Sequence, residues 1–216
     1  ISRRINDMKT WLKKPELIQP DENASYEEII EINLSKVTQP IVACPNDPDN
    51  VKEIKDVENT KIDEVFIGSC MTNIGHYRAA AKILEGIKKL NAKLWICPPT
   101  KMDEETLKAE GYYDIFEKCG ARLELPGCSL CMGNQARVDE GSVVFSTSTR
   151  NFDNRLGKNA QVFLGSAELA AVCALLGKIP TVNEYQDITK NKINPYSDEL
   201  YRYLQFDEIE NFSLSK

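Results

Sequence analysis

The chain has 216 residues, 42% of them hydrophobic and 28% charged, so it is long enough to bury a core and to form one domain with extensions. Its 33 acidic and 27 basic residues give a net charge of -6, which argues against a protein that holds nucleic acid through its overall field. There is no signal peptide, no apolar run long enough to span a membrane and no regular disulfide spacing among the seven cysteines. These features predict a protein of the reducing cytoplasm.

The first sixty residues are weakly patterned. Residues 1–4 have no initiator methionine and no targeting character, so we expect the chain to begin inside a longer protein. In chain order, the pattern predicts a short helix at 7–14, an alternating extended stretch at 28–34 and a run into turn formers at 41–49. We interpret residues 1–60 as an approach segment that packs on the rest of that longer protein.

A strand, a helix and a second strand follow at residues 65–67, 75–90 and 93–97. The first strand ends at Gly68, and the helix has an apolar stripe with lysines and a glutamate off it. Three such elements within about 35 residues make a βαβ unit, which implies a parallel sheet. Ligand sites in parallel sheets collect at the carboxyl ends of the strands, which is where Cys70 falls.

The same alternation continues to residue 180. The pattern predicts helices at 103–110 and 112–118, strands at 121–125, 142–146 and 161–164, and a helix at 166–176 with Ser166 as N-cap and Gly177 near its end. We therefore predict an α/β domain with a parallel sheet at 61–180. Residues 181–216 are interpreted as a polar carboxyl-terminal tail that wraps back through its aromatic residues Tyr201, Tyr203 and Phe206.

Three cysteines have chemically suggestive contexts: Cys70 in Gly-Ser-Cys-Met-Thr-Asn, and the pair Cys128 and Cys131 in Pro-Gly-Cys-Ser-Leu-Cys-Met-Gly-Asn. They could give three thiolates to one iron-sulfur cluster with no obvious fourth ligand, which leaves one iron open to a substrate. Structural zinc and thiol redox chemistry are the alternatives, although the only histidine is His76. We expect the other cysteines to be small core residues: Cys44, Cys97, Cys119 and Cys173.

A second feature is the loop at 146–157, which is dense in hydroxyls and amides and contains Arg150 and Arg155. Two arginines five residues apart could form a fork for carboxylates, and the alternative is a solvated loop with two surface arginines. An open iron favours oxygen donors, and an arginine fork favours a carboxylate. A small hydroxy-polycarboxylic acid would satisfy both.

Three features of the chain resemble the carboxyl-terminal, cluster-binding part of the bacterial aconitate hydratase B family. They are these cysteine contexts, the stretch Ser-Thr-Ser-Thr-Arg-Asn-Phe-Asp-Asn-Arg and the later Ala-Glu-Leu-Ala-Ala-Val-Cys-Ala-Leu-Leu-Gly-Lys-Ile-Pro-Thr. The resemblance runs from near residue 7 to residue 204 and implies an α/β domain of the aconitase iron-sulfur type. It matches Cys70, Cys128 and Cys131 to the three ligands of a 4Fe-4S cluster. It matches Arg150 and Arg155 to substrate-binding arginines.

The implied reaction is that of a hydro-lyase of the tricarboxylic acid cycle. Citrate and isocitrate interconvert through cis-aconitate, with the cluster as Lewis acid and no net redox change. The family's serine base matches nothing in this chain, so we expect no catalytic residue here, and Ser146, Ser148 and Ser166 are not candidates for it. The implied partners are the remaining domains of the same protein, and this chain alone is expected to be inactive.

Several roles stay open from the sequence. Met71 separates Cys70 from Thr72, where many relatives have Gly-Ser-Cys-Thr-Asn, so the resemblance does not settle the role of Asn73. Thr149 stands where many relatives have asparagine. His76 is either a site residue or a capping or packing residue.

Two rival functions are an isopropylmalate-type dehydratase of the same superfamily and a regulator that binds messenger RNA when the cluster is lost. Met71 and the Arg-Leu-Gly after Asn154 favour the aconitase B interpretation over the dehydratase. The net charge of -6 makes this chain a poor sole surface for RNA.

Overall fold

The computed structural model describes residues 2–14, 19–133 and 136–202. Contacts between residues separate the chain up to Lys36 from a compact unit that spans Val37–Arg202. The domain boundaries expected at residues 60 and 180 stay predictions.

The amino-terminal part contains the helix α1 (Ser2–Lys13) and a short 3-10 helix η1 (Leu34–Lys36). The predicted helix at 7–14 is therefore present and starts earlier, and none of its residues is buried. The alternating stretch before η1 forms no strand in the described part of the chain. Its isoleucines Ile29, Ile30 and Ile32 are 77%, 76% and 73% exposed.

The compact unit is built on one seven-stranded sheet with the order β2-β1-β7-β6-β3-β4-β5. The strands are β1 (Ile41–Ala43), β2 (Val51–Glu53), β3 (Glu64–Gly68), β4 (Lys93–Cys97), β5 (Arg122–Leu123), β6 (Val143–Ser146) and β7 (Gln161–Leu164). The five strands from β7 to β5 are parallel, which confirms the predicted parallel sheet. The edge formed by β1 and β2 is antiparallel, so the whole sheet is mixed.

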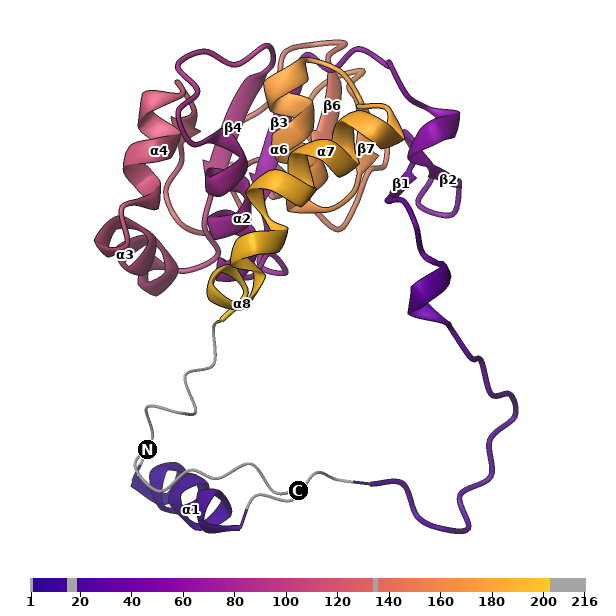
Figure 1. The fold of residues 1–216 in the computed structure, drawn as a ribbon, viewed down its shortest axis with the longest axis vertical. Coiled ribbons are helices and arrows are strands. Elements are labelled where there is room, and N and C mark those ends of the chain that lie inside the picture. The colour runs from indigo at the N-terminus through magenta and orange to yellow at the C-terminus, as the bar shows by residue number, and fades with distance from the viewer. Residues whose placement is uncertain (1, 15–18, 134–135, 203–216) are drawn as a thin grey trace. The chain divides into compact units, whose positions relative to one another are not determined.

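Most of the helices cover one face of this sheet (Figure 1), whereas α5 (Ser129–Met132) contributes Leu130 and Cys131 to the core on the other face. The other described helices of the unit are α2 (Ile74–Leu84), α3 (Lys101–Ala109), α4 (Tyr112–Lys118), α6 (Ala167–Leu176), α7 (Val182–Lys192) and α8 (Ser197–Leu200), with 3-10 turns η2 (Ile54–Asp56) and η3 (Asn194–Tyr196). The helices α2 and α6 pack against each other, and α6 packs on β3. None of the helices described is long and apolar enough to cross a membrane.

The two faces of the sheet bury different residues because successive side chains of a strand point to opposite sides. Val65 and Ile67 of β3 belong to the large core under the helices, whereas Phe66 between them belongs to a smaller core on the other face. That smaller core is closed by apolar residues of the segment between β5 and β7, among them Leu130 and Leu156. The segment that contains the predicted cysteine pair is therefore fixed to the sheet by its own apolar side chains.

The observed helix ends test the predictions made from capping residues. Ser166 caps α6 by accepting a hydrogen bond from the backbone N–H of Leu169, and Gly177 ends it with a left-handed φ of 71°, so both predictions are confirmed. The helix predicted at 75–90 instead ends at Leu84, and Gly86 follows with a φ of 85°.

The tail predicted after residue 180 contains the helix α7, which the sequence analysis missed. Thr181 and Glu184 form a reciprocal capping box at its start, a signal that is visible in the sequence. Tyr201 packs against the large core, as expected of an aromatic residue that fixes the tail. Tyr203 and Phe206 lie outside the described residues.

Candidate functional site at the carboxyl edge of the sheet

The loop that contains Cys70 leaves the carboxyl end of β3. Ser69 is fully buried and has a φ of 114°, a conformation that residues with a side chain rarely adopt. This turn leaves Cys70 exposed, next to an exposed Met71. Asn73 then caps α2 by accepting a hydrogen bond from the backbone N–H of Gly75 at 2.9 Å, which gives this residue the structural role that the sequence left open.

The loop that contains the cysteine pair is tied to the carboxyl end of β4. The N–H of Gly127 donates to the carbonyl of Pro98 at 2.9 Å. The Sγ of Cys97 lies 3.2 Å from the carbonyl oxygens of Leu125 and of Gly127. Beyond this anchor, Cys128 is exposed and Cys131, one turn later in α5, is buried.

Cys97 makes these contacts with Leu125 and Gly127 as a neutral thiol. Burial raises the pKa of Cys97 to about 12, so its S–H is retained at neutral pH and can donate to one of the two carbonyls. Cys97 is fully buried, and its Sγ is occupied by these two carbonyls. Cys44, Cys119 and Cys173 are also buried, as predicted for core residues, and all seven cysteines are free.

The loop that contains the two arginines leaves the carboxyl end of β6. Its base is fixed by Asn151, which is fully buried and donates to the carbonyl of Cys44 at 2.6 Å. Arg150 is exposed. Arg155 lies against the cysteine loop, with its Nη2 3.7 Å from the Sδ of Met132, and its buried Nε has no hydrogen-bond partner among the described residues.

The three loops meet because β6, β3 and β4 are neighbours in the sheet. Parallel strands bring their carboxyl ends to the same edge, as the sequence predicted for Cys70. The chemistry of the donors fits a three-thiolate site, since Cys70, Cys128 and Cys131 are free cysteines, while the Sγ of Cys97 lies against two backbone carbonyls. No three Cys, His, Asp or Glu side chains in the described part of the chain are gathered closely enough to hold a metal ion. The ligand set therefore stays a prediction.

Comparison with known proteins identifies the family. The sequence model of the Aconitase family (aconitate hydratase) matches residues 2–177. The chain belongs to the aconitase family. It is 65% identical over 210 residues to aconitate hydratase B of Synechocystis sp., an alignment that covers 97% of this chain and 24% of that protein. It is 55% identical over 221 residues to aconitate hydratase B of Helicobacter pylori, covering 99% of this chain and 26% of that protein.

A relative that is named for another activity is more distant. The 3-isopropylmalate dehydratase large subunit of Clostridium kluyveri is 39% identical over 170 residues, which cover 77% of this chain and 40% of that protein. This aconitase-family chain spans about a quarter of the length of the aconitate hydratase B relatives that it matches.

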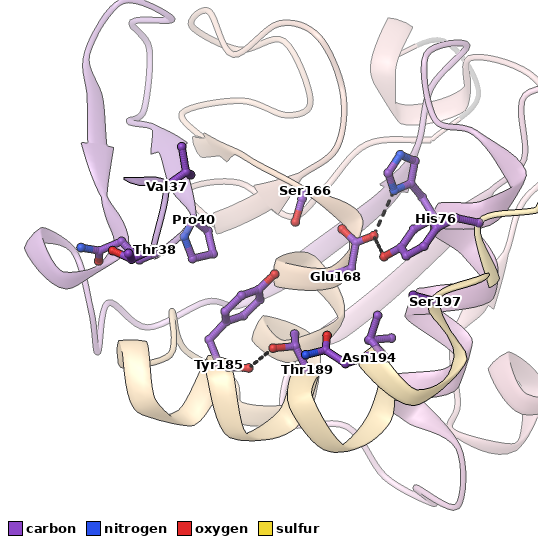
Figure 2. Close-up of a pocket in the computed structure, with 13 residues that line it drawn as sticks. Val37, Thr38, Pro40, His76, Ser166, Glu168, Tyr185, Thr189, Asn194 and Ser197 are labelled. Atoms are coloured by element: carbon purple, nitrogen blue, oxygen red, sulfur yellow. Dashed lines mark hydrogen bonds and ion pairs between the residues drawn. The ribbon is translucent and has the colours of Figure 1, made fainter. Parts of the chain in front are cut away.

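A second polar cluster lies on the helix side of the aconitase-family domain and lines a pocket of about 570 Å³ (Figure 2). The Nδ1 of His76 lies 3.0 Å from Glu168 Oε1, and the hydroxyl of Tyr201 donates to the same oxygen at 2.6 Å. Burial opposes ionisation of Glu168, but the hydrogen bonds from His76 and Tyr201 prevail and lower its pKa to about 2. The hydrogen bond with Glu168 in turn raises the pKa of His76. His76 therefore links α2 to α6, which favours the packing role over a site role.

Two hydroxyls at the base of the predicted site were not predicted from the sequence. Thr147 and Thr72 both hydrogen-bond to the backbone of Gly68, at the end of β3. A threonine directly after a buried strand is the signal that was present, but its partner could not be read from the sequence. Thr149, in contrast, is exposed.

Proposed function

We propose that this chain is the cluster-binding part of an aconitate hydratase, a hydro-lyase that interconverts citrate and isocitrate through cis-aconitate. The observation that carries the proposal is the meeting of three loops, two with cysteines and one with arginines, at neighbouring strand ends. The 65% identity to an aconitate hydratase B supports the choice of substrate over the more distant isopropylmalate dehydratases.

In this proposal Cys70, Cys128 and Cys131 hold a 4Fe-4S cluster. The cluster, when bound, supplies an iron without a thiolate ligand that acts as a Lewis acid on a substrate oxygen. Cys70 and Cys128 are exposed, so their sulfur atoms are accessible for this role. Cys97 stays outside the proposed ligand set because it is fully buried and its Sγ lies against the backbone carbonyls of Leu125 and Gly127.

Arg150 and Arg155 bind the substrate carboxylates. A guanidinium forms two parallel hydrogen bonds to a carboxylate, which fixes the orientation of a planar anion. Arg155 lies beside Met132, the residue after Cys131, so a carboxylate on Arg155 would be next to the cysteine loop.

The rest of the protein completes the active site. The aconitate hydratase B relatives are about four times as long as this chain, and the serine base that the family resemblance implies matches no residue here. We infer that the remaining domains are partners of this one, that the chain alone does not turn over citrate, and that the enzyme works in the cytoplasm, where free cysteines persist. Binding of messenger RNA by the cluster-free protein stays a prediction, testable by a salt-dependent binding assay.

The test is anaerobic reconstitution of the full-length protein with iron and sulfide, followed by visible absorption spectroscopy and citrate turnover. We expect Cys70→Ser to prevent cluster assembly as fully as Cys128→Ser or Cys131→Ser. The matched control is Cys44→Ala, a buried cysteine with no proposed ligand role, which should reconstitute normally. A normal 4Fe-4S spectrum from Cys70→Ser would show that the ligand assignment is wrong.

A further inference from the structure

The side chain of Thr147 binds both backbone groups of Gly68. The N–H of Gly68 donates to Thr147 Oγ1 at 2.9 Å, and Thr147 Oγ1 donates to the carbonyl of Gly68 at 2.8 Å. The backbone pairing of β3 with β6 ends just before this point, at Phe66 and Ser146. The hydroxyl of Thr147 therefore extends the contact between these two strands by one residue, at the point where both strands lead into the loops of the candidate site.

Thr72 binds the same carbonyl group of Gly68 as Thr147. Its hydroxyl donates to the carbonyl of Gly68 at 2.9 Å and lies 3.2 Å from the hydroxyl of Thr147. A carbonyl oxygen has two lone pairs, so Gly68 can accept from both threonines. Thr72 follows Cys70 by two residues and Thr147 precedes Arg150 by three. The bases of the cysteine loop and the arginine loop are thus joined through one backbone carbonyl.

Gly68 has little freedom to adjust. A Cβ at this position would lie 2.4 Å from the ring of Phe66 and 2.9 Å from the carbonyl oxygen of Cys97, so only glycine fits there. Ser69 follows in its unfavourable conformation with a φ of 114°. A strained residue keeps its conformation only when its surroundings hold it, and the two threonine hydroxyls are the side-chain contacts that hold the preceding peptide.

We propose that Thr147 is a positioning residue that sets the sulfur of Cys70 relative to the arginine loop. The functional meaning rests on the proposed function, because that proposal makes Cys70 a cluster ligand and Arg150 a substrate ligand. The coupling itself rests on the hydrogen bonds at Gly68. Thr147 acts on Cys70 through its hydrogen bonds to the backbone of Gly68, two residues before Cys70.

The test compares Thr147→Val with Thr147→Ser in the full-length protein. Valine has the shape of threonine without the hydroxyl, whereas serine keeps the hydroxyl and both hydrogen bonds. The first readout is the rate at which iodoacetamide alkylates Cys70 in the cluster-free protein, followed by peptide mass spectrometry. Thr147→Val loses both hydrogen bonds to Gly68, so we expect this rate to change by at least about fivefold, the factor for a single such bond. Thr147→Ser should stay near the wild-type rate.

Two further readouts use the reconstituted protein: the lifetime of the cluster in the presence of a chelator, and the KM for isocitrate. Thr147→Val should shorten the lifetime and raise KM, each by about fivefold, with restoration by Thr147→Ser. The control is Thr189→Val, which removes a comparable hydroxyl that donates to the carbonyl of Tyr185 at 2.9 Å within α7. This control should match the wild-type protein in all three measurements.

The outcomes separate this inference from the proposed function. A wild-type alkylation rate in Thr147→Val would overturn the inference even if the enzyme is an aconitate hydratase. If Cys70→Ser assembles a normal cluster, the proposed function fails, but the alkylation rate of the cluster-free protein still tests the coupling. Should Thr147→Val not fold, Thr72→Val decides instead, because it opens the Gly68 contact from the other side and an unchanged Cys70 rate would equally overturn the inference.

Discussion

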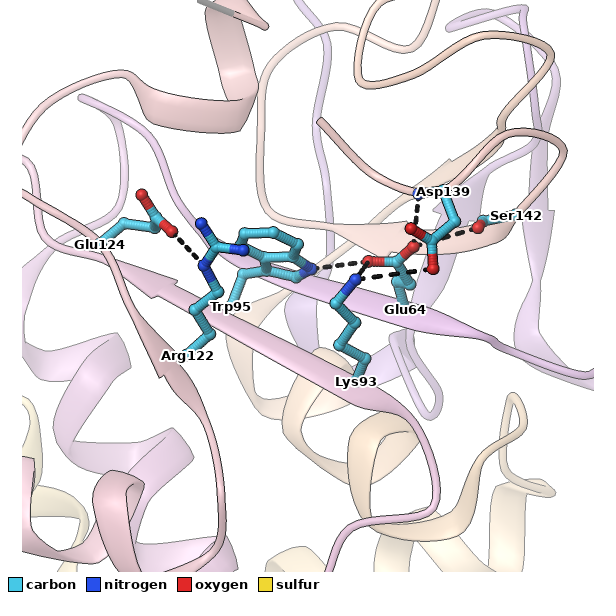
Figure 3. Close-up of polar contacts among 7 residues, drawn as sticks. All are labelled: Glu64, Lys93, Trp95, Arg122, Glu124, Asp139 and Ser142. Atoms are coloured by element: carbon cyan, nitrogen blue, oxygen red, sulfur yellow. Dashed lines mark hydrogen bonds and ion pairs between the residues drawn. The ribbon is translucent and has the colours of Figure 1, made fainter. Parts of the chain in front are cut away.

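The two ends of the central strands β3 and β4 are built in opposite ways. At the amino end, the carboxylate of Glu64 is only 2% exposed and is surrounded by donors (Figure 3). It accepts from the indole N–H of Trp95 at 2.7 Å, the backbone N–H of Asp139 at 2.7 Å and the hydroxyl of Ser142 at 3.1 Å, and it pairs with Lys93 at 3.3 Å. Such a network fixes the segment that leads into β6.

At the carboxyl edge of the sheet, the loops that follow β3, β5 and β6 contain strained and incompletely paired groups. Ser69 and Ser129 have positive φ values of 114° and 33°. Cys70 and Cys128 are exposed, and the buried Nε of Arg155 has no hydrogen-bond partner among the described residues. The comparison shows that the satisfied polar network holds the sheet at one end, while the other end retains strain and free ligand atoms where a site is proposed.

The largest expected effect is on stability, at the amino end. Glu64→Ala removes a buried acceptor and leaves the indole of Trp95 and the ammonium of Lys93 without it, so the free energy of unfolding should fall by about 4 kcal/mol. Urea unfolding of the full-length protein measures this change. Glu140→Ala, which breaks an exposed ion pair with Lys158, should cost less than about 1 kcal/mol. Equal losses in the two variants would contradict the special role of the buried network.

The next effect is on function, at the carboxyl end. Arg150→Lys keeps the charge but removes the bidentate geometry, so kcat/KM for citrate should fall by about 100-fold while the cluster spectrum stays unchanged. Steady-state kinetics with the full-length protein is the measurement. Arg122→Lys is the matched control, since Arg122 lies over the ring of Trp95, pairs with Glu124 and has no proposed role in the site. Unaltered kinetics would mean that Arg150 is a surface arginine of a solvated loop and does not bind the substrate.

A pair of serine replacements sharpens the comparison. Ser142→Gly removes a hydroxyl that donates to Glu64 at 3.1 Å and should lower the free energy of unfolding by about 1 kcal/mol. Ser69→Gly relieves a positive φ of 114°, so it should leave stability unchanged or raise it by up to about 1 kcal/mol. Cluster lifetime should nevertheless shorten in Ser69→Gly. A clear destabilisation by Ser69→Gly would mean that its conformation is not strained.

The smallest effect concerns the pair of His76 and Glu168. The raised pKa of His76 means that its contribution is complete below its ordinary pKa of 6.5 and is lost as the pH rises through the folded value. The pKa of Glu168, lowered to about 2 from 4.5, means that its contribution is complete above pH 4.5 and is lost as the pH falls towards 2. The ion pair should therefore stabilise the fold most between about pH 4.5 and 6.5.

His76→Gln tests this window. Because the His76 side chain is 42% exposed, the loss at pH 6 should be only about 0.5 kcal/mol, and the difference from wild type should shrink as the pH rises. Urea unfolding at pH 6 and pH 9 measures it. His76 is the only histidine of the chain, so no other histidine in it can cause a change of this difference with pH. A difference in the free energy of unfolding that grows with pH would contradict the pairing.

The sequence by itself determined the elements of the parallel sheet and the residues presented at its edge. The strand at 93–97 was predicted with its observed bounds, and Ser166 was predicted as the cap of α6. Both follow from local rules, since a buried strand is a short apolar run and an N-cap bonds three residues ahead. The turn after β3 also made Cys70 a candidate, because the position of a residue at a strand end is a local property.

The tertiary structure decided which of these residues are partners. It joined Thr147 to Gly68, 79 residues apart, Trp95 to Glu64, 31 apart, and His76 to Glu168, 92 apart. The strand order β6-β3-β4 sets the first two contacts, and the packing of α2 against α6 sets the third. Periodicity shows which face of an element is buried but not what that face meets, because the neighbour is chosen by how the whole sheet and its helices pack together.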